Sequence, residues 1–160
     1  KYTTSSVTSL NGTALAEFTL PSNCFRAWFA VKGMSSASSS EKVMKVKAGG
    51  SVITTGYYAT SAKLENSTDP TLSSSDAAMF KFTAGYDAAG HARTGIVEFV
   101  LYDDHDWLWT WQDFGDEGNT INVSAGSIAL SSELQAVQFI SSTGNFDGSG
   151  SIKGHYFATT

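Results

Sequence analysis

The sequence predicts an all-β fold, an antiparallel β-sandwich of the jelly-roll type. Apolar residues recur mainly at every second position, and the segments that carry this alternation are short. Gly, Ser, Asn and Asp separate these segments, as turn residues separate strands. Strands at intervals of roughly 12 to 16 residues leave no room for crossover helices between parallel strands. We therefore expect helix in under about a tenth of the chain.

About ten segments are predicted as strands. In the first two, 14–20 and 25–31, alanine and large apolar residues alternate with other residues. The first ends at Pro21, because proline removes a donor from the strand ladder, and the second ends at Gly33. Only 131–141 has a composition that would also suit a short helix. The remaining predicted strands are 42–48, 53–59, 78–84, 95–102, 107–112, 120–130, 134–140 and 150–157.

The last two of these segments are predicted to pair antiparallel as a terminal hairpin, because glycines in the loop between them suit turn geometry. Ile152 and Tyr156 should then lie on one face of the last strand. Lys153 and Phe157 should lie on the other.

Composition limits the class of protein. A length of 160 residues suits one domain, 1–160, and the single cysteine, Cys24, permits no intrachain disulfide. Charged residues make up only 16% of the chain and the net charge is −5, so we expect no nucleic-acid partner. No apolar run approaches the roughly 18 residues of a membrane-spanning helix, and the first residues lack a signal-peptide pattern. We therefore expect no membrane insertion.

The segment 103–113 holds the densest group of unusual residues. Trp107, Trp109 and Trp111 lie on one face of the strand predicted there. If buried, such a row forms a wall of the core or of a subunit interface, which is the favoured interpretation. If exposed, it forms a surface on which sugar rings stack, and Tyr57 and Tyr58 are further candidates for that binding site. The third interpretation is a mixed case, with one ring buried and another exposed.

Acidic residues around this strand are weak candidates for a calcium site, because calcium prefers oxygen ligands. The candidates are Asp103, Asp104, Asp106, Asp113 and Asp116. Their spacing does not match an EF-hand loop, and carboxylates in turns usually bond to the backbone. We therefore predict no metal and no cofactor. A glycosidase would need two carboxylates about 5 to 9.5 Å apart across a cleft, a pattern that any acidic β-protein can supply.

No catalytic centre is predicted. His91, His105 and His155 are too scattered in sequence for a zinc site. The glycine and serine residues of 148–151 do not form a nucleophile elbow, and Cys24 has no histidine near it in sequence. We therefore expect a protein that is not an enzyme and that acts by presenting a surface.

Three stretches of the chain resemble a β-sandwich module found in structural proteins of tailed bacteriophages. Residues 17–25 (EFTLPSNCF) are similar to the opening hairpin of that family, and 56–59 (GYYA) are similar to its glycine and tyrosine strand. Residues 144–152 (GNFDGSGSI) are similar to its closing hairpin. The family often closes its final strand with Leu-Tyr-Gly, whereas this chain has Gly-His-Tyr at 154–156.

This resemblance implies a non-enzymatic module of a tail fibre, a tail-associated protein or a capsid decoration protein, located in the virion. It implies contacts with other virion proteins, a homo-oligomer that is most often a trimer, and contact with a host surface that carries glycans. Independently, 12% aromatic and 16% charged residues give more apolar material than one small core hides, which predicts an interface. The alternative is a carbohydrate-binding module that stacks sugars on exposed tryptophans.

Overall fold

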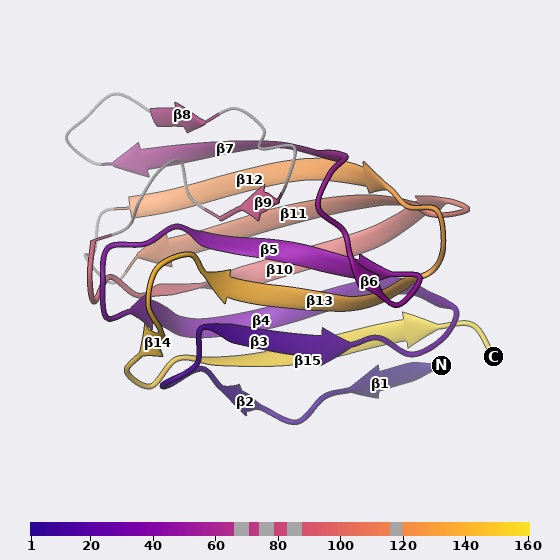
Figure 1. The fold of residues 1–160 in the computed structure, drawn as a ribbon, viewed down its shortest axis with the longest axis horizontal. Helices are drawn as coiled ribbons and strands as arrows, with labels where there is room; N and C mark the ends of the chain where they lie inside the picture. The colour runs from indigo at the N-terminus through magenta and orange to yellow at the C-terminus, as the bar shows by residue number, and fades with distance from the viewer. Residues whose placement is uncertain (66–70, 74–78, 83–87, 116–119) are drawn as a thin grey trace.

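Two antiparallel β-sheets pack face to face (Figure 1). The computed structural model describes residues 1–65, 71–73, 79–82, 88–115 and 120–160. These residues form strands and no helix, so the predicted all-β sandwich is confirmed. None of them belongs to a helix of the length and apolar character that crossing a membrane requires.

The larger sheet has ten strands. Their bounds are β1 Tyr2–Thr4, β2 Thr8–Ser9, β4 Cys24–Ser36, β7 Tyr57–Glu65, β8 Thr71–Ser73, β10 Arg93–Asp103, β11 Asp106–Gly115, β12 Thr120–Ala129, β14 Phe146–Asp147 and β15 Ser151–Ala158. Eight of them lie in the order β1-β15-β4-β10-β11-β12-β7-β8, while β2 pairs with β15 and β14 pairs with β4.

The smaller sheet has five strands and lies in front of the larger one in Figure 1. Their bounds are β3 Leu15–Thr19, β5 Lys42–Ala48, β6 Ser51–Val52, β9 Phe80–Lys81 and β13 Leu134–Ser141. The order is β3-β13-β5-β6, and β9 also pairs with β5. The jelly-roll connectivity is not confirmed, because β10, β11 and β12 form a meander of consecutive neighbours, whereas a jelly roll is built from Greek keys.

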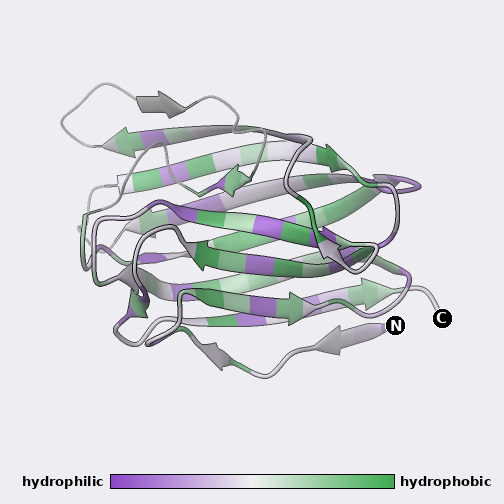
Figure 2. Ribbon diagram, in the orientation of Figure 1, coloured by the Kyte–Doolittle hydropathy of each residue, from purple (hydrophilic) through white to green (hydrophobic). Residues whose placement is uncertain are grey.

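The core lies between the two sheets and is rich in aromatic rings. Hydrophobic and hydrophilic residues alternate along many strands (Figure 2), and each sheet turns its apolar side inward. Phe139 of the smaller sheet contacts Phe29 of the larger sheet edge to face, with ring centres 5.3 Å apart. Phe82 stacks on the same Phe139 ring at 5.6 Å. These contacts hold the sheets together through buried apolar area and favourable ring geometry.

The predicted terminal hairpin is wrong. β13 lies between β3 and β5 in the smaller sheet, whereas β15 lies between β1 and β4 in the larger sheet. The intervening residues, 142–150, include β14, which pairs with β4, so the chain crosses to the other sheet instead of turning back. The predicted faces of β15 are correct, since Ile152 and Tyr156 are buried while Lys153 and Phe157 are half-exposed.

Several strand boundaries also differ from the prediction. The first four residues of the predicted strand 53–59 connect β6 to β7 and are not strand, and only 57–59 belong to β7. Gly56 in this connection has a φ of 84°, a conformation that glycine adopts without strain. Of the predicted strand 78–84, β9 is the strand within the described residues 79–82, and the remaining positions lie outside the described residues. The five short strands β1, β2, β6, β8 and β14 were not predicted, because two or three residues carry too little alternation.

The lysines of β5 alternate with apolar residues in the sequence, a pattern that suggests one solvated face. The structure shows that they do not share one face. Lys42 is fully buried, on the same face as Met44 and Val46. Lys45 and Lys47 lie on the opposite face, because positions separated by an odd number of residues alternate across a strand. Lys47 Nζ is 3.1 Å from Glu17 Oε1 on that outer side.

Candidate functional site

The three tryptophans of β11 lie in the core. Trp107, Trp109 and Trp111 are 2%, 1% and 0% exposed. Trp109 contacts Phe80 with ring centres 4.5 Å apart, and Trp111 contacts Phe82 at 4.7 Å. Their burial is the favoured one of the arrangements that the sequence allows. A surface for stacking sugars therefore does not form at these rings.

The two tyrosines lie on opposite faces of β7. Tyr57 is 1% exposed, and its hydroxyl accepts a hydrogen bond from Val46 N and donates one to Ile53 O, both at 2.9 Å. Burial raises the pKa of Tyr57 to about 12. Tyr58 points outward and is 68% exposed. The structure therefore does not gather the aromatic candidates into one site.

Asp113, one of the calcium candidates, is a buried structural residue. Its Oδ2 accepts a hydrogen bond from Trp111 Nε1 at 2.8 Å, and its Oδ1 accepts bonds from Asn122 N at 3.1 Å and Asn122 Nδ2 at 2.6 Å. Burial raises the pKa of this carboxyl, against the lowering effect of these bonds and of the Arg93 charge. Asp113 thus anchors β11 to β12 inside the sandwich.

Three further calcium candidates, which the structure describes, do not join Asp113. Asp103, Asp104 and Asp106 are exposed at the turn between β10 and β11. Asp113 lies seven residues along β11 from Asp106, which is roughly 24 Å in a strand. Asp116 lies outside the described residues. In the part of the chain that the structure describes, no group of three or more His, Cys, Asp or Glu side chains could hold a metal ion.

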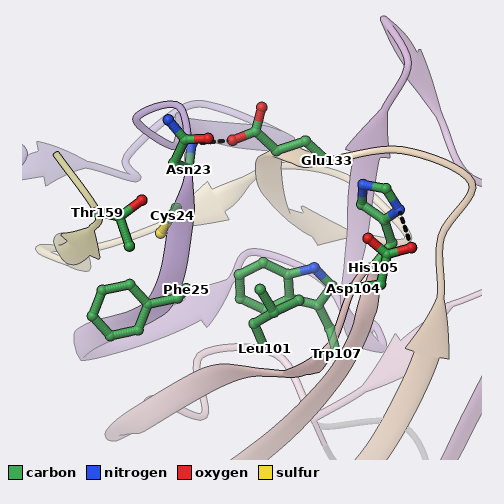
Figure 3. A pocket seen from close by; sticks show the side chains of 9 residues that line it. All are labelled: Asn23, Cys24, Phe25, Leu101, Asp104, His105, Trp107, Glu133 and Thr159. Carbon is green, nitrogen blue, oxygen red and sulfur yellow. Dashed lines mark hydrogen bonds and ion pairs between the residues drawn. The ribbon is translucent and has the colours of Figure 1, made fainter.

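A pocket of about 360 Å³ opens at one end of the sandwich (Figure 3). Glu133 accepts a hydrogen bond from the Asn23 backbone, and His105 Nδ1 lies 3.4 Å from Asp104 Oδ2. Burial raises the pKa of the Cys24 thiol, which disfavours the nucleophilic thiolate. The pocket thus offers hydrogen-bond acceptors without an activated nucleophile. Its lining is Asn23, Cys24, Phe25, Leu101, Asp104, His105, Trp107, Glu133 and Thr159.

The outer side of the larger sheet carries many apolar side chains and no charged one over parts of three adjacent strands. We call it the uncharged face: the outward residues at alternate positions of 58–64 in β7, 121–129 in β12 and 108–114 in β11. None of these described positions holds Asp, Glu, Lys or Arg. Its large exposed apolar side chains are Tyr58, Leu64, Leu108, Phe114, Ile121 and Val123, each at least 40% exposed.

A groove of about 800 Å³ borders the uncharged face. Its apolar walls include Ile96 of β10, Phe114 of β11 and Ile121 of β12. Ala30 is a small residue on the β4 side of the groove, and Lys32 provides a charge in its lining. The groove gives this otherwise regular sheet surface a depression into which a partner's side chains would fit.

The fourth tryptophan, Trp28, points outward from β4 on the same sheet. Its neighbour across the strands on one side is His155 of β15, and on the other side it is Glu98 of β10. The indole and imidazole rings are stacked with centres 3.7 Å apart and planes 1° from parallel. Tyr2 extends this stack, because its hydroxyl lies 2.6 Å from His155 Nδ1.

A second small pocket, of about 260 Å³, lies on the β10 side of Trp28. Its lining consists of Trp28, Ile96, Arg26 and Glu98. Arg26 Nη2 and Nε each lie 2.5 Å from Glu98 Oε1. Burial, and to a lesser extent the charge of Lys153, lowers the pKa of His155, which favours the neutral imidazole behind the indole. We call this feature the Trp28 pocket.

Sequence reasoning missed the Trp28 pocket, although a signal for it exists. In 25–31 the alternating apolar positions are Phe25, Ala27, Phe29 and Val31, all buried except Phe25, so Trp28 falls among the alternate, outward positions with Arg26. A tryptophan out of phase with the core is a candidate surface contact.

Comparison of the chain with models of known protein families and with curated protein sequences found no match.

Proposed function

We propose that this chain is a non-enzymatic structural module of a bacteriophage virion, and that copies of it assemble through the uncharged face. The observation that carries the proposal is the row of six large apolar side chains exposed on three neighbouring strands without a charge among them. Contiguous apolar surface of this kind is typical of protein interfaces. The phage resemblance of 17–25, 56–59 and 144–152 supports the virion as the location.

A second copy of the chain is the partner that suits the uncharged face best. Two such faces brought together bury no charged side chain, so neither copy pays for an unpaired charge in a dry interface. Phe114 and Ile121 border the groove and offer aromatic and branched side chains of the kind that a matching depression receives. Around a three-fold axis the contact would be head-to-tail, with one part of the uncharged face in each copy against another part in the next copy, in the trimer that the resemblance implies.

In the virion, such an oligomer would act as a capsid decoration, tail-fibre or tail-associated part, docked on other virion proteins. Its role is assembly and contact with the host surface, without a reaction of its own. The buried Cys24, with its raised pKa, and the structural role of Asp113 agree with a non-catalytic function. We expect an interface of more than roughly 1,000 Å², the size that separates specific assemblies from crystal contacts.

The assembly is tested by light scattering of the purified chain over a range of concentrations. We expect the mass of three chains for the natural sequence and a shift towards one chain for Phe114→Lys and Ile121→Lys, because each places a charge in the interface. Leu15→Lys is the matched control, since Leu15 is 44% exposed on the smaller sheet and should leave the oligomer intact. A monomer at every concentration would contradict assembly, and absence of the chain from purified particles by mass spectrometry would contradict the virion role.

A further inference from the structure

We propose that the Trp28 pocket binds one neutral pyranose ring of a surface polysaccharide. This inference goes beyond the proposed assembly, because the pocket lies between β4 and β10, whereas the uncharged face begins at β11. The two regions are adjacent, since Ile96 lines both the pocket and the groove beside the uncharged face.

One face of the Trp28 indole remains for the ligand. The strand order places β15 on one side of β4 and β10 on the other. His155 of β15 covers the first face of the indole in a parallel stack. The pocket lies on the β10 side, where Trp28 shares its lining with Ile96 and Glu98. The apolar C–H face of a sugar ring stacks on an aromatic face of this kind.

Polar groups at the pocket suit hydroxyls. Arg26 Nη2 and Nε both contact Glu98 Oε1, and within the described residues Oε2 of Glu98 accepts no hydrogen bond. Oε2 can therefore accept a bond from a sugar hydroxyl, while the guanidinium has further N–H donors for hydroxyl oxygens. The charges of Arg26 and Glu98 cancel, so the pocket favours an uncharged ligand over an acidic or basic one.

The size of the pocket limits the ligand to a single ring. Its volume of about 260 Å³ lies below the roughly 300–1,000 Å³ of sites for drug-sized molecules. One ring held by one aromatic contact binds weakly, and we expect a Kd on the order of 1 mM for a monosaccharide. A polymer presenting many such rings would bind an oligomer more tightly, through effective concentration.

Saturation-transfer NMR and calorimetric titration of the chain test the inference. The probes are the methyl glycosides of glucose, mannose and galactose, together with N-acetylglucosamine. We expect at least one probe to bind, and Trp28→Ala to weaken its binding about tenfold or more. Trp28→Phe, which keeps an aromatic face, should retain part of the affinity.

Tyr102→Ala is the matched control, because Tyr102 is an exposed aromatic residue of β10 outside the pocket. It should bind the sugar as the natural sequence does. Far-ultraviolet circular dichroism verifies that each variant is folded. The inference is overturned if no probe binds at 10 mM, or if Trp28→Ala binds as well as Tyr102→Ala. Light scattering of the same samples reports assembly separately, so failure of sugar binding and failure of the proposed assembly are distinguishable.

Discussion

The tryptophans of β11 and the tryptophan of β4 occupy opposite sides of the same sheet. The three rings of β11 face the core, where Trp109 packs on Phe80. Trp28 faces outward, where it stacks on His155 and borders a pocket. The row of three is the more conspicuous feature of the sequence, yet the single ring is the one with a face towards a possible ligand.

The difference shows that the phase of an aromatic residue within a strand predicts its role better than its abundance does. Residues in phase with the apolar positions of their strand contribute to the core. In β11 the alternate positions hold Leu108, Thr110 and Gln112, a mixed set that leaves the phase ambiguous. In β4 the outward set contains Arg26 and Lys32, which identifies the side of Trp28 as the solvent side.

The largest contrast should appear when the two kinds of tryptophan are truncated. Trp109→Ala should lower the free energy of unfolding by about 3–5 kcal/mol, because it leaves a cavity in the core. Trp28→Ala should lower it by only about 1 kcal/mol, the loss of a partly exposed ring stack. Urea unfolding followed by circular dichroism measures both. Equal losses of unfolding free energy for the two variants would contradict the distinction between the core tryptophan and the outward one.

A smaller effect is expected at the polar anchor beside the inner tryptophans. Asp113→Ala removes the acceptor of the Trp111 indole N–H and of the backbone and side-chain N–H groups of Asn122. Three buried donors without partners should lower the free energy of unfolding by roughly 2–4 kcal/mol. Asp106→Ala, at an exposed position of the same strand, should change it by less than about 0.5 kcal/mol. A neutral effect of Asp113→Ala in urea unfolding would show that the bonds to Trp111 and Asn122 do not stabilise the core.

The adjacent residues Tyr57 and Tyr58 of β7 offer the same comparison between an inward and an outward side chain, here for the hydroxyl group. Tyr57→Phe should cost about 1–2 kcal/mol, because Val46 N–H and Ile53 O lose their partner. Tyr58→Phe, on the exposed side, should cost almost nothing.

The pH dependence of stability tests the burial of Tyr57. The unfolded chain releases the Tyr57 proton near pH 10, whereas the folded chain holds it to a pKa of about 12. The stabilisation from Tyr57 is therefore complete below pH 10 and is lost as the pH rises towards 12. Urea unfolding at pH 9 and pH 11 should reveal a larger loss in the natural sequence than in Tyr57→Phe, where Cys24 and Tyr156, whose pKa values burial also raises, still contribute. The same pH dependence in Tyr57→Phe would assign it to another group.

The smallest effect concerns the imidazole behind Trp28. Burial is the main cause of the lowered pKa of His155, so Trp28→Ala should move this pKa up towards the usual 6.5. Because the folded pKa is the lower one, His155 stabilises the fold above pH 6.5, and this contribution is lost as the pH falls below it. NMR titration of the imidazole protons measures the shift. Tyr102→Ala should leave the pKa of His155 unchanged. A shift of equal size in Tyr102→Ala would show that loss of the Trp28 stack is not the cause of the shift.

Periodicity predicted the class of fold and most of the long strands, because alternation records which side of a strand meets the core. It could not predict which strands pair, since any two alternating segments offer compatible inner faces. β13 and β15 illustrate this limit: they follow one another closely in sequence and belong to different sheets. The nonlocal packing of β13 between β3 and β5 decides the pairing, and no local pattern in 134–157 encodes it.

The Trp28 pocket was less accessible to prediction than the fold. Its residues come from β4 and β10, and Arg26 and Glu98 are 72 positions apart in the chain. The register that places Glu98 opposite Trp28 arises only when the larger sheet is assembled. The uncharged face had a partial sequence signal, the low charge of the chain, but its position also depends on the order β11-β12-β7.

The pairing of β1 with β15 has a mechanical consequence. These strands run antiparallel, with Tyr2 opposite Phe157, and the backbone nitrogen of Lys1 donates a hydrogen bond to Ala158 O, so residues 1 and 160 lie at one corner (Figure 1). Tension applied between the two ends would break the hydrogen bonds between β1 and β15 one pair after another. It would not load all of these bonds at the same time in shear. The β1–β15 pairing is therefore expected to resist tension poorly along this direction.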